Sequence, residues 1–348
     1  MEKVLAYQNN SISENACLIS EGREEYIKNL DIAAEEFNKD LENIEKRCFD
    51  PKENSRDLLN ATTKVIMDIM HVCEEFEQIV KNKDIIHDAR INFREKTNPI
   101  LSKSYCINRA RTWPQGHQGD YKTLEVVYKN MPLSKGIGYY LDLCLLNITL
   151  AHAVRNRIKK LEELLRDEIS KRQQPSVLNI ACGSCRELMG LVSDISASGA
   201  KVICIDNDND ALAFAENRLS YTGVLSQIEF RKYNAIRMFD DELNMMEFGK
   251  QDIIYSVGLF DYLPDDFLVK LLSALYNLLN PGGKLIAAFK DADRYEHQPF
   301  HWIVDWDGFL QRTKSDFNSL LYQAGIPDSA ISETREESGV VIFYLITK

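Results

Sequence analysis

Apolar residues in the first third of the chain recur every three or four positions, from about Glu24 to Arg47 and again from Arg56 to Asn82. That spacing places them on one face of a helix and predicts two amphipathic helices. The segment 48–55 contains Pro51 and is predicted to connect them. Such helices could form a lid over a substrate, a dimer surface or a scaffold, and a plain helical bundle fits the pattern equally well.

The pattern changes at Val177, from where short apolar runs alternate with helical periodicity. Strands are predicted to begin at 177, to span 201–206 and 228–235, and to begin at 251, with a fifth launched by the turn at 280–283. Helices are predicted at about 211–219, 265–279 and 314–324, and the chain ends in two strands, 329–335 and 340–347, joined as a hairpin. This order is typical of an α/β fold with a mostly parallel sheet and an antiparallel last strand.

These patterns divide the chain into three predicted parts. They are an N-terminal helical domain over 1–108, a connecting loop and lid helix over 109–170, and the sheet domain over 171–348. The lid helix is predicted from about Lys135 to Ile169. A chain of 348 residues exceeds the usual size of one domain, which agrees with this division.

Composition narrows the class of protein. The eight cysteines have no framework spacing, the residues from Met1 to Val4 do not open a signal peptide, and no apolar run reaches about 18 residues. We therefore expect a reduced, cytoplasmic protein without a membrane span. The net charge of −11 disfavours a nucleic-acid partner held through its phosphates, so a small-molecule substrate is expected.

The segment from Val177 to Glu187 is an apolar strand that runs into a tight loop of small residues and then a helix, which is how α/β proteins present backbone N–H groups to a nucleotide. It fits neither the dinucleotide fingerprint nor the P-loop. It resembles the first motif of class I methyltransferases that use S-adenosylmethionine, an acidic residue followed by x-Gly-x-Gly-x-Gly. Here Asn179 takes the acidic position, Ala181 and Cys185 take the first and third glycine positions, and Gly183 is kept.

The cysteine pair Cys182 and Cys185 has the spacing of a redox or zinc motif. A zinc site needs about four ligands, and no second pair with ligand spacing follows in the sequence. Buried small residues are therefore the favoured interpretation of both cysteines.

Later residues continue the cofactor site. Asp206 ends the second strand about 20 residues after the loop, where an acid can bind the ribose hydroxyls, and Asn234 is expected beside the adenine. One of the two arginines Arg155 and Arg157 could neutralise the methionine carboxylate of the cofactor, or both could lie on a solvated helix face. The predicted cofactor site comprises Ala181, Cys182, Gly183, Arg186, Asp206, Asn207, Asn234, Ala235, Ser256, Val257, Gly258, Tyr121 and Arg157.

From Arg109 to the C-terminus the chain resembles the bacterial methyltransferases that make 3-hydroxypalmitic acid methyl ester, an extracellular factor. The resemblance rests on the segments Pro114–Tyr121, Ala153–Arg157, Ala181–Glu187, Tyr255–Pro264, Asp305-Trp306 and Arg312-Thr313. It implies a Rossmann-like class I sheet, S-adenosylmethionine as cofactor and S-adenosylhomocysteine as product. Gln115 and His117 replace an arginine and a tyrosine of the family pattern in the loop on the substrate side.

Methyl transfer from a sulfonium is an in-line displacement, to which positioning contributes strongly. A carboxylate acceptor needs no base, whereas a hydroxyl, amine or guanidine acceptor would benefit from one; the candidates are His297, His301 and Glu296. The residues predicted to contact the substrate are His117, Asp120, Phe260, Asp261, Tyr262, Trp302, Asp305 and Trp306.

Three functions remain open at this point. The resemblance favours O-methylation of a hydroxy-acid carboxylate, whereas the carboxylates Asp120, Asp261, Glu296, Asp305 and Asp307 favour N-methylation of a small cation such as the guanidine of arginine. A protein that binds S-adenosylmethionine without turnover is the third. A homodimer through the N-terminal helices is also expected.

Overall fold

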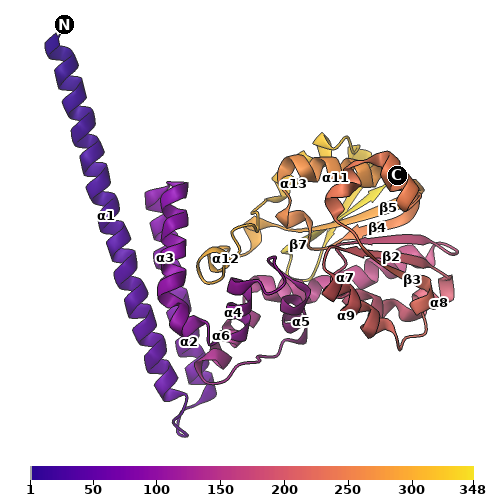
Figure 1. Ribbon diagram of the computed structural model, residues 1–348, viewed down its shortest axis with the longest axis horizontal. Helices are drawn as coiled ribbons and strands as arrows, with labels where there is room; N and C mark the ends of the chain where they lie inside the picture. The colour runs from indigo at the N-terminus through magenta and orange to yellow at the C-terminus, as the bar shows by residue number, and fades with distance from the viewer. Residues whose placement is uncertain (1) are drawn as a thin grey trace. The chain divides into compact units, whose positions relative to one another are not determined.

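The computed structural model describes residues 2–348, with side chains from residue 25 onward (Figure 1). The segment 1–4, on which the signal-peptide expectation rests, therefore lies outside the described side chains. The chain forms two compact units. The first comprises Met1–Thr112, Pro132–Leu145 and Gln298–Trp306, and the second comprises Trp113–Met131, Leu146–His297 and Asp307–Lys348.

This division differs from the three predicted domains because two segments distant in sequence belong to the helical unit. Asp142 attaches the first of them: its carboxylate accepts hydrogen bonds from Ser104 Oγ at 2.6 Å and from the backbone N–H groups of Leu133 and Ser134 at 3.0 Å. Trp302 attaches the second, because it is fully buried and its indole N–H donates to Glu77 Oε1 at 2.7 Å. Neither pairing has a signature in the local sequence.

The first unit is helical, as predicted. Its helices are α1 (Glu2–Arg47), α2 (Ser55–Val80), α3 (Lys83–Leu101), α4 (Tyr105–Thr112), α6 (Ile137–Leu146) and α12 (Gln298–Trp302). The amphipathic pattern of α2 is confirmed by the burial of Leu58, Ile69, Phe76 and Val80 along one face. Asn54 caps its N-terminus by accepting from the backbone N–H of Arg56.

The long helix predicted from about Lys135 to Ile169 is wrong as a single element. The structure has α6 and then α7 (Thr149–Ser170), separated by Asn147 and Ile148. Asparagine is a poor helix former because its side chain competes for nearby backbone groups, and Ile148 has an extended conformation with ψ 156°. The continuous apolar pattern concealed this break.

The second unit contains a seven-stranded sheet in the order β3-β2-β1-β4-β5-β7-β6. The strands are β1 (Ser176–Ile180), β2 (Lys201–Asp206), β3 (Ile228–Lys232), β4 (Gln251–Ser256), β5 (Leu279–Lys290), β6 (Ile331–Arg335) and β7 (Val341–Thr347). The first five pair in parallel, and β7 pairs antiparallel with both β5 and β6. The predicted Rossmann-like sheet with its antiparallel last strand is confirmed.

Helices cover both faces of this sheet (Figure 1): α11 and α13 lie on one face, and α7, α8 and α9 on the other. The helices of this unit are α5 (Tyr121–Lys129), α7, α8 (Val192–Ser198), α9 (Asn209–Leu219), α10 (Asp241–Glu247), α11 (Asp265–Leu278) and α13 (Lys314–Gln323). Short 3-10 turns occupy Arg186–Leu191, Leu225–Gln227, Ala235–Phe239, Phe260–Tyr262, Ala292–Arg294 and Asp328–Ala330. The core between the sheet, α11 and α13 includes Leu178, Ile254, Leu285 and Phe317.

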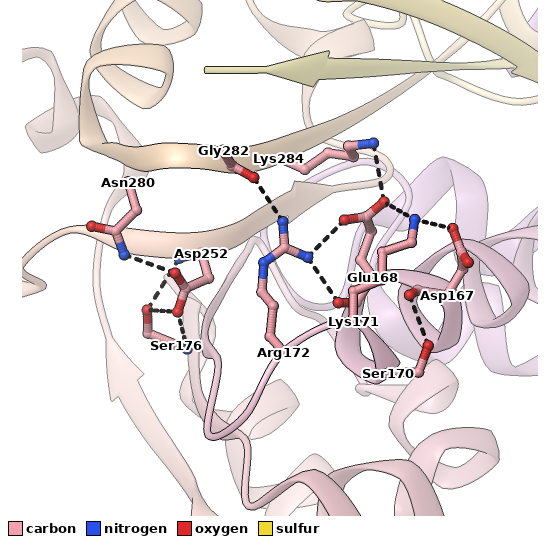
Figure 2. A network of polar contacts seen from close by, with 10 residues as sticks. All are labelled: Asp167, Glu168, Ser170, Lys171, Arg172, Ser176, Asp252, Asn280, Gly282 and Lys284. Carbon is pink, nitrogen blue, oxygen red and sulfur yellow. Dashed lines mark hydrogen bonds and ion pairs between the residues drawn. The ribbon is translucent and has the colours of Figure 1, made fainter.

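A polar network joins the end of α7 to the starts of the strands (Figure 2). Glu168, which is 4% exposed, receives hydrogen bonds or ion pairs from Lys171, Arg172 and Lys284. Arg172 also donates to the backbone carbonyl of Gly282 at 2.8 Å. The carboxyl ends of the strands, where open α/β sheets bind ligands, lie at the opposite end of the sheet from this network.

Among residues 2–348, no single helix is long and apolar enough to cross a membrane. The consecutive helices α6 and α7 satisfy a test of length and composition only when they are taken together.

Candidate active site

A cavity of about 520 Å³ opens at the carboxyl ends of β1, β2 and β4 in the second unit. That volume is within the usual range for small-molecule sites. The predicted cofactor residues that line it are Ala181, Gly183, Asp206, Asn207, Asn234, Ala235, Val257, Gly258 and Tyr121. Residues predicted from five separate segments of the sequence therefore line one cavity.

The loop after β1 has an alternating backbone conformation. Ala181, Gly183 and Cys185 all have positive φ, at 53°, 54° and 46°. These are the three positions that the motif assigns to glycine, which adopts this conformation without strain. The backbone of the glycine motif is therefore kept although two of its glycines are not.

Asp206 holds this loop against β2. Its Oδ2 accepts from the backbone N–H of Gly183 at 2.8 Å, and its Oδ1 accepts from the N–H of Asp208 at 2.9 Å. Burial raises the pKa of Asp206, while the two backbone donors act in the opposite direction. Each oxygen keeps a second lone pair, so the carboxylate can still accept from ribose hydroxyls.

Helix α5 is fixed beside the loop by Glu125, which the sequence reading missed. Its carboxylate accepts from Ser184 Oγ at 2.8 Å and pairs with Arg186 at 3.1 Å and Arg218 at 2.6 Å. Burial opposes ionisation of Glu125, yet Arg218 and its other partners lower the net pKa. Arg186, predicted to bind cofactor, is thus engaged with Glu125 and does not line the cavity. An acid in an amphipathic helix gives no sequence signal for this role.

Arg157 lies beside Gly258, which lines the cavity. It is 3% exposed, and its Nη2 donates to the hydroxyl of Tyr128 at 2.8 Å. Its Nη1 lies 3.6 Å from the position that a Cβ on Gly258 would occupy. The side chain is therefore buried rather than on a solvated face, and the absence of a side chain at Gly258 leaves the guanidinium close to the cavity.

Two further predicted cofactor residues do not line the cavity. Ser256 is fully buried, and its hydroxyl donates to the backbone carbonyl of Ile180 at 2.9 Å, so it joins the ends of β4 and β1. Cys182 is buried, and its thiol donates to the backbone carbonyl of Gly183 at 3.8 Å. Asn234 lines the cavity while its side chain also caps the following turn at Ile236.

The cavity lining also includes His117, Gln118, Leu259, Tyr262 and Gly308. Tyr262 and His117 were predicted to contact substrate. Tyr262 passes close to Gly119, where a Cβ would lie 2.6 Å from the tyrosine hydroxyl. Glycine is therefore required at that position. His117 is half exposed, with its Nε2 3.9 Å from Asp208 Oδ2.

Three other predicted substrate residues have structural partners instead. Asp120 caps α5 by accepting from the N–H groups of Lys122 and Thr123 at 2.8 and 3.0 Å. Asp261 forms a buried ion pair with Lys290. Phe260 is fully buried against Phe317 in the core under the sheet. They support the site without lining the cavity.

The segment 295–307 requires the largest correction. Trp302 was predicted to wall the pocket, but it is fully buried among Phe76 and Phe93 in the helical unit. Asp305 pairs with Arg94 at 3.4 Å, and Trp306 stacks on Phe300 at 5.7 Å, both within that same unit. These apolar and acidic residues hold the segment in the helical core.

The predicted bases also lie outside the cavity lining. His301 is 7% exposed in α12, and its backbone carbonyl accepts from Arg94 at 2.6 Å. Glu296 is exposed, and its Oε2 accepts from Thr149 Oγ1 at 3.2 Å. His297 belongs to the sheet unit but is not part of the lining.

Within residues 25–348, whose side chains are described, no group of three or more histidine, cysteine or acidic side chains is placed to hold a metal ion.

Comparison with known proteins identifies a domain in the second unit. Residues 177–283 match the family described as a methyltransferase domain. No curated protein is similar enough in sequence to be matched to this chain. Together with the seven-stranded sheet, the family match means that the chain carries a class I methyltransferase domain, an enzyme domain that uses S-adenosylmethionine and releases S-adenosylhomocysteine.

Three solved structures are similar to the chain. A "possible exported protein" from Bordetella parapertussis is 16% identical over 92% of this chain and 96% of that chain, with a TM-score of 0.56, so it shares the fold. The magnesium protoporphyrin IX methyltransferase of Synechocystis with bound S-adenosylmethionine is 14% identical over 58% of this chain and 84% of that chain, with a TM-score of 0.41. A SAM-dependent methyltransferase from Aquifex aeolicus is 18% identical over 55% and 96%, with a TM-score of 0.38.

Proposed function

We propose that this enzyme is an O-methyltransferase that converts the carboxylate of a small hydroxy acid into its methyl ester. The observation that carries the proposal is the part of the cavity lining outside the predicted cofactor residues. Most of its side chains are neutral, among them Trp113, Gln118, Leu259 and Tyr262, and its members that can carry a charge are His117 and Asp208. A mostly neutral lining with an amide and a phenol suits an aliphatic acid better than a guanidinium, which would need a carboxylate partner.

Three of the five carboxylates that favoured a cationic acceptor already have other partners. Asp120 caps a helix, and Asp261 and Asp305 pair with Lys290 and Arg94. A carboxylate neutralised by a buried lysine or arginine offers little attraction to a second cation. Asp206 and Asp208 do line the cavity, but Asp206 is a predicted cofactor residue and Asp208 caps α9.

The residues of the site fit S-adenosylmethionine. Asp206 would bind the ribose hydroxyls, the loop from Ala181 to Gly183 would lie against the methionine part, and Arg157 would neutralise its carboxylate. The cofactor supplies an electrophilic methyl group on a sulfonium. Tyr262 and Leu259 exclude water from the acceptor side, and the enzyme's contribution is to align the acceptor oxygen with the methyl carbon.

The place of the predicted bases agrees with this chemistry. A carboxylate is already a nucleophile at neutral pH and loses no proton in the transfer, so the reaction needs no general base. Glu296, His297 and His301 do not line the cavity. Turnover should therefore survive replacement of each histidine by alanine.

The test is incubation with methyl-labelled S-adenosylmethionine and a panel of hydroxy acids of increasing chain length, amino acids and guanidines. A base-labile methyl ester on a hydroxy acid is the expected product. Labelled arginine with no labelled carboxylate would instead establish N-methylation and overturn the proposal. Binding of S-adenosylhomocysteine without labelling of any acceptor would favour a binding protein without turnover.

Cofactor binding is tested by calorimetry with S-adenosylhomocysteine on one variant of the site and one matched control variant. Asp206→Ala should weaken binding about a hundredfold or more, because it removes the ribose acceptor and the bond that orders the loop. Asp210→Ala removes an acid four residues away that pairs with Gln115 and does not line the cavity, and it should bind normally.

The homodimer through the N-terminal helices stays a prediction that sedimentation can test.

A further inference from the structure

Two neutral polar side chains of the cavity lining, Gln118 and Tyr262, make no hydrogen bond to the residues whose side chains are described. The Oε1 atom of Gln118 is in addition shielded from solvent. A buried polar group without a partner is destabilising, and folded proteins keep few of them. Two such groups in the lining of one cavity indicate that a ligand supplies their partners.

Adjoining segments carry these two groups. Gln118 precedes Gly119, where a Cβ would lie 2.6 Å from the hydroxyl oxygen of Tyr262. The amide of Gln118 packs over Gly308, where a Cβ would lie 3.0 Å from Oε1. Phe309 follows Gly308, and its ring centroid lies 5.6 Å from that of Tyr262. Two glycines therefore allow both polar side chains to pack closely against the backbone at one part of the lining.

The ring of Tyr262 is fixed by its neighbours. It packs against Phe309, and Lys290 Nζ lies 6.0 Å from its centroid. Lys290 is held in turn by its ion pair with Asp261, the residue before Tyr262. Burial raises the pKa of the Tyr262 hydroxyl, so this group keeps its proton at neutral pH and can donate it in a hydrogen bond.

We propose that Gln118 and Tyr262 form a subsite that binds a hydroxyl group of the acceptor molecule and thereby selects hydroxy acids over unsubstituted acids. An alcohol is both a donor and an acceptor. Its proton is donated to Gln118 Oε1, and its oxygen accepts from the hydroxyl of Tyr262. The terminal torsion of a glutamine is soft, so the amide can turn toward a ligand in the cavity. That the acceptor is an acid rests on the function proposed above, whereas the recognition of a hydroxyl does not.

The hydrogen-bonding capacity of the two groups disfavours other occupants. A carboxylate only accepts hydrogen bonds and would leave Gln118 Oε1 unpaired. A guanidinium or ammonium only donates and would leave the proton of Tyr262 unpaired. A methylene group would bury both side chains without any partner, and a site built to bind a hydroxyl rejects the analogue that lacks it for this reason.

The first test measures binding without methyl transfer. Hydroxy acids of increasing chain length, each paired with the unsubstituted acid of the same length, are titrated into the full-length protein saturated with S-adenosylhomocysteine. The wild type should bind the hydroxy acid about tenfold to a hundredfold more tightly than its unsubstituted partner. Equal affinities in every pair, or no binding of any acid, overturn the proposal.

Two variants assign the preference to the two side chains. Tyr262→Phe removes the hydroxyl and keeps the ring, and Gln118→Met removes the amide and keeps the length of the side chain. Each should lower the preference about fivefold to tenfold by weakening the hydroxy acid alone, and the double variant should bind both acids nearly equally. A merely structural role would weaken both acids together and leave their ratio unchanged.

Matched controls make the same changes outside the lining. The hydroxyl of Tyr295 donates to Gln311 at 2.5 Å, and the amide of Gln115 donates to Asp210 at 2.9 Å. Neither residue lines the cavity. Tyr295→Phe and Gln115→Met should therefore keep the wild-type preference for the hydroxy acid. The affinity of each variant for S-adenosylhomocysteine shows whether it is folded, and if one site variant is not, the other decides.

Methyl-labelled S-adenosylmethionine with the same pairs of acids separates this proposal from the proposed function. Methyl esters that form with a higher kcat/KM on the hydroxy acids support both. Esters that form with equal kcat/KM in every pair overturn the subsite and leave the function. Preferential binding of hydroxy acids without any ester contradicts the function and leaves the subsite. Wild-type preference in both Tyr262→Phe and Gln118→Met overturns the assignment to these residues.

Discussion

The side-chain amide of Asn179 donates to Glu187 Oε1 over 2.9 Å. Asn179 occupies the position where the methyltransferase motif has an acid, and Glu187 follows eight residues later, after the loop. The hydroxyl of Tyr255 donates to the same oxygen at 2.8 Å. The carboxyl group beside Asn179 therefore comes from Glu187, on the far side of the loop, and is bonded to residues of β1 and β4.

The first prediction concerns the proton on Glu187. Burial raises the pKa of Glu187 to about 7, although the bond from Tyr255 acts in the opposite direction. The folded protein keeps this proton between its ordinary pKa near 4.3 and pH 7, whereas the unfolded chain loses it. Stability should therefore fall as pH rises through that interval and level off above it, by a total on the order of 3 kcal/mol.

Urea unfolding at pH 5, 6, 7 and 8 checks this expectation. Glu187→Gln stays neutral at every pH and keeps an oxygen that accepts from Asn179, so its stability relative to wild type should increase from pH 5 to pH 8. Parallel pH profiles for the two proteins would mean that the carboxyl is already ionised at pH 5.

Much of the sheet could be predicted because hydrophobic residues recur with different spacings in strands and in helices, and because characteristic residue types mark each turn. The second strand was predicted at 201–206, and β2 has those bounds. Asp208 caps α9 by accepting from the N–H of Asp210, as its sequence position suggests. The break between α6 and α7 was missed, because the apolar residues continue across it.

A second prediction uses the strained loop. Ala181 has a φ of 53°, which costs a non-glycine residue about 1 kcal/mol, and its methyl group is exposed. Ala181→Gly should stabilise the protein by about 1 kcal/mol or somewhat less, since glycine also gains entropy in the unfolded chain. The matched control is Ala213→Gly, an exposed alanine within α9, which should destabilise by about 1 kcal/mol. Two losses of equal size in chemical denaturation would contradict the strain argument.

A third prediction tests whether Arg157 contacts the methionine end of the cofactor rather than its adenosine end. Arg157 lies under Gly258 and is assigned here to the methionine carboxylate. Arg157→Met should weaken binding of S-adenosylhomocysteine about tenfold to a hundredfold, because it removes a buried charged donor. Adenosine lacks that carboxylate and should bind equally to both proteins. Arg155→Met, two residues earlier on a partly exposed side chain, is the control in the same calorimetry, and an equal loss for adenosine would indicate a general packing defect.

The segment 295–307 shows where sequence reasoning stops. Histidines, tryptophans and acids cluster there, and that composition is typical of a substrate site. It is equally what a short segment needs in order to pack into a helical core. Trp302 packs between two phenylalanines, and Arg94 donates to the carbonyl of His301 and pairs with the carboxylate of Asp305. The partners are about 200 residues away in the chain, so only the fold distinguishes the two interpretations. Arg157 shows the converse, since its burial excludes the solvated helix face that its sequence position also allowed.

A last prediction concerns the network around Glu168 at the edge of the sheet opposite the cavity (Figure 2). Burial alone would raise the pKa of Glu168, but hydrogen bonds from Arg172, Lys171 and Lys284 lower it to about 2. Its contribution to stability is therefore present above the ordinary pKa near 4.3 and is lost as pH falls from there toward 2. Glu168→Gln should destabilise the protein by about 3 kcal/mol at pH 7, since three cations lose a buried partner, and the difference from wild type should shrink as pH falls toward 2. Asp167→Asn removes an exposed partner of Lys171 and should cost less than about 0.5 kcal/mol in the same urea titrations. Equal small losses for both variants would show that Glu168 contributes no more than a surface ion pair.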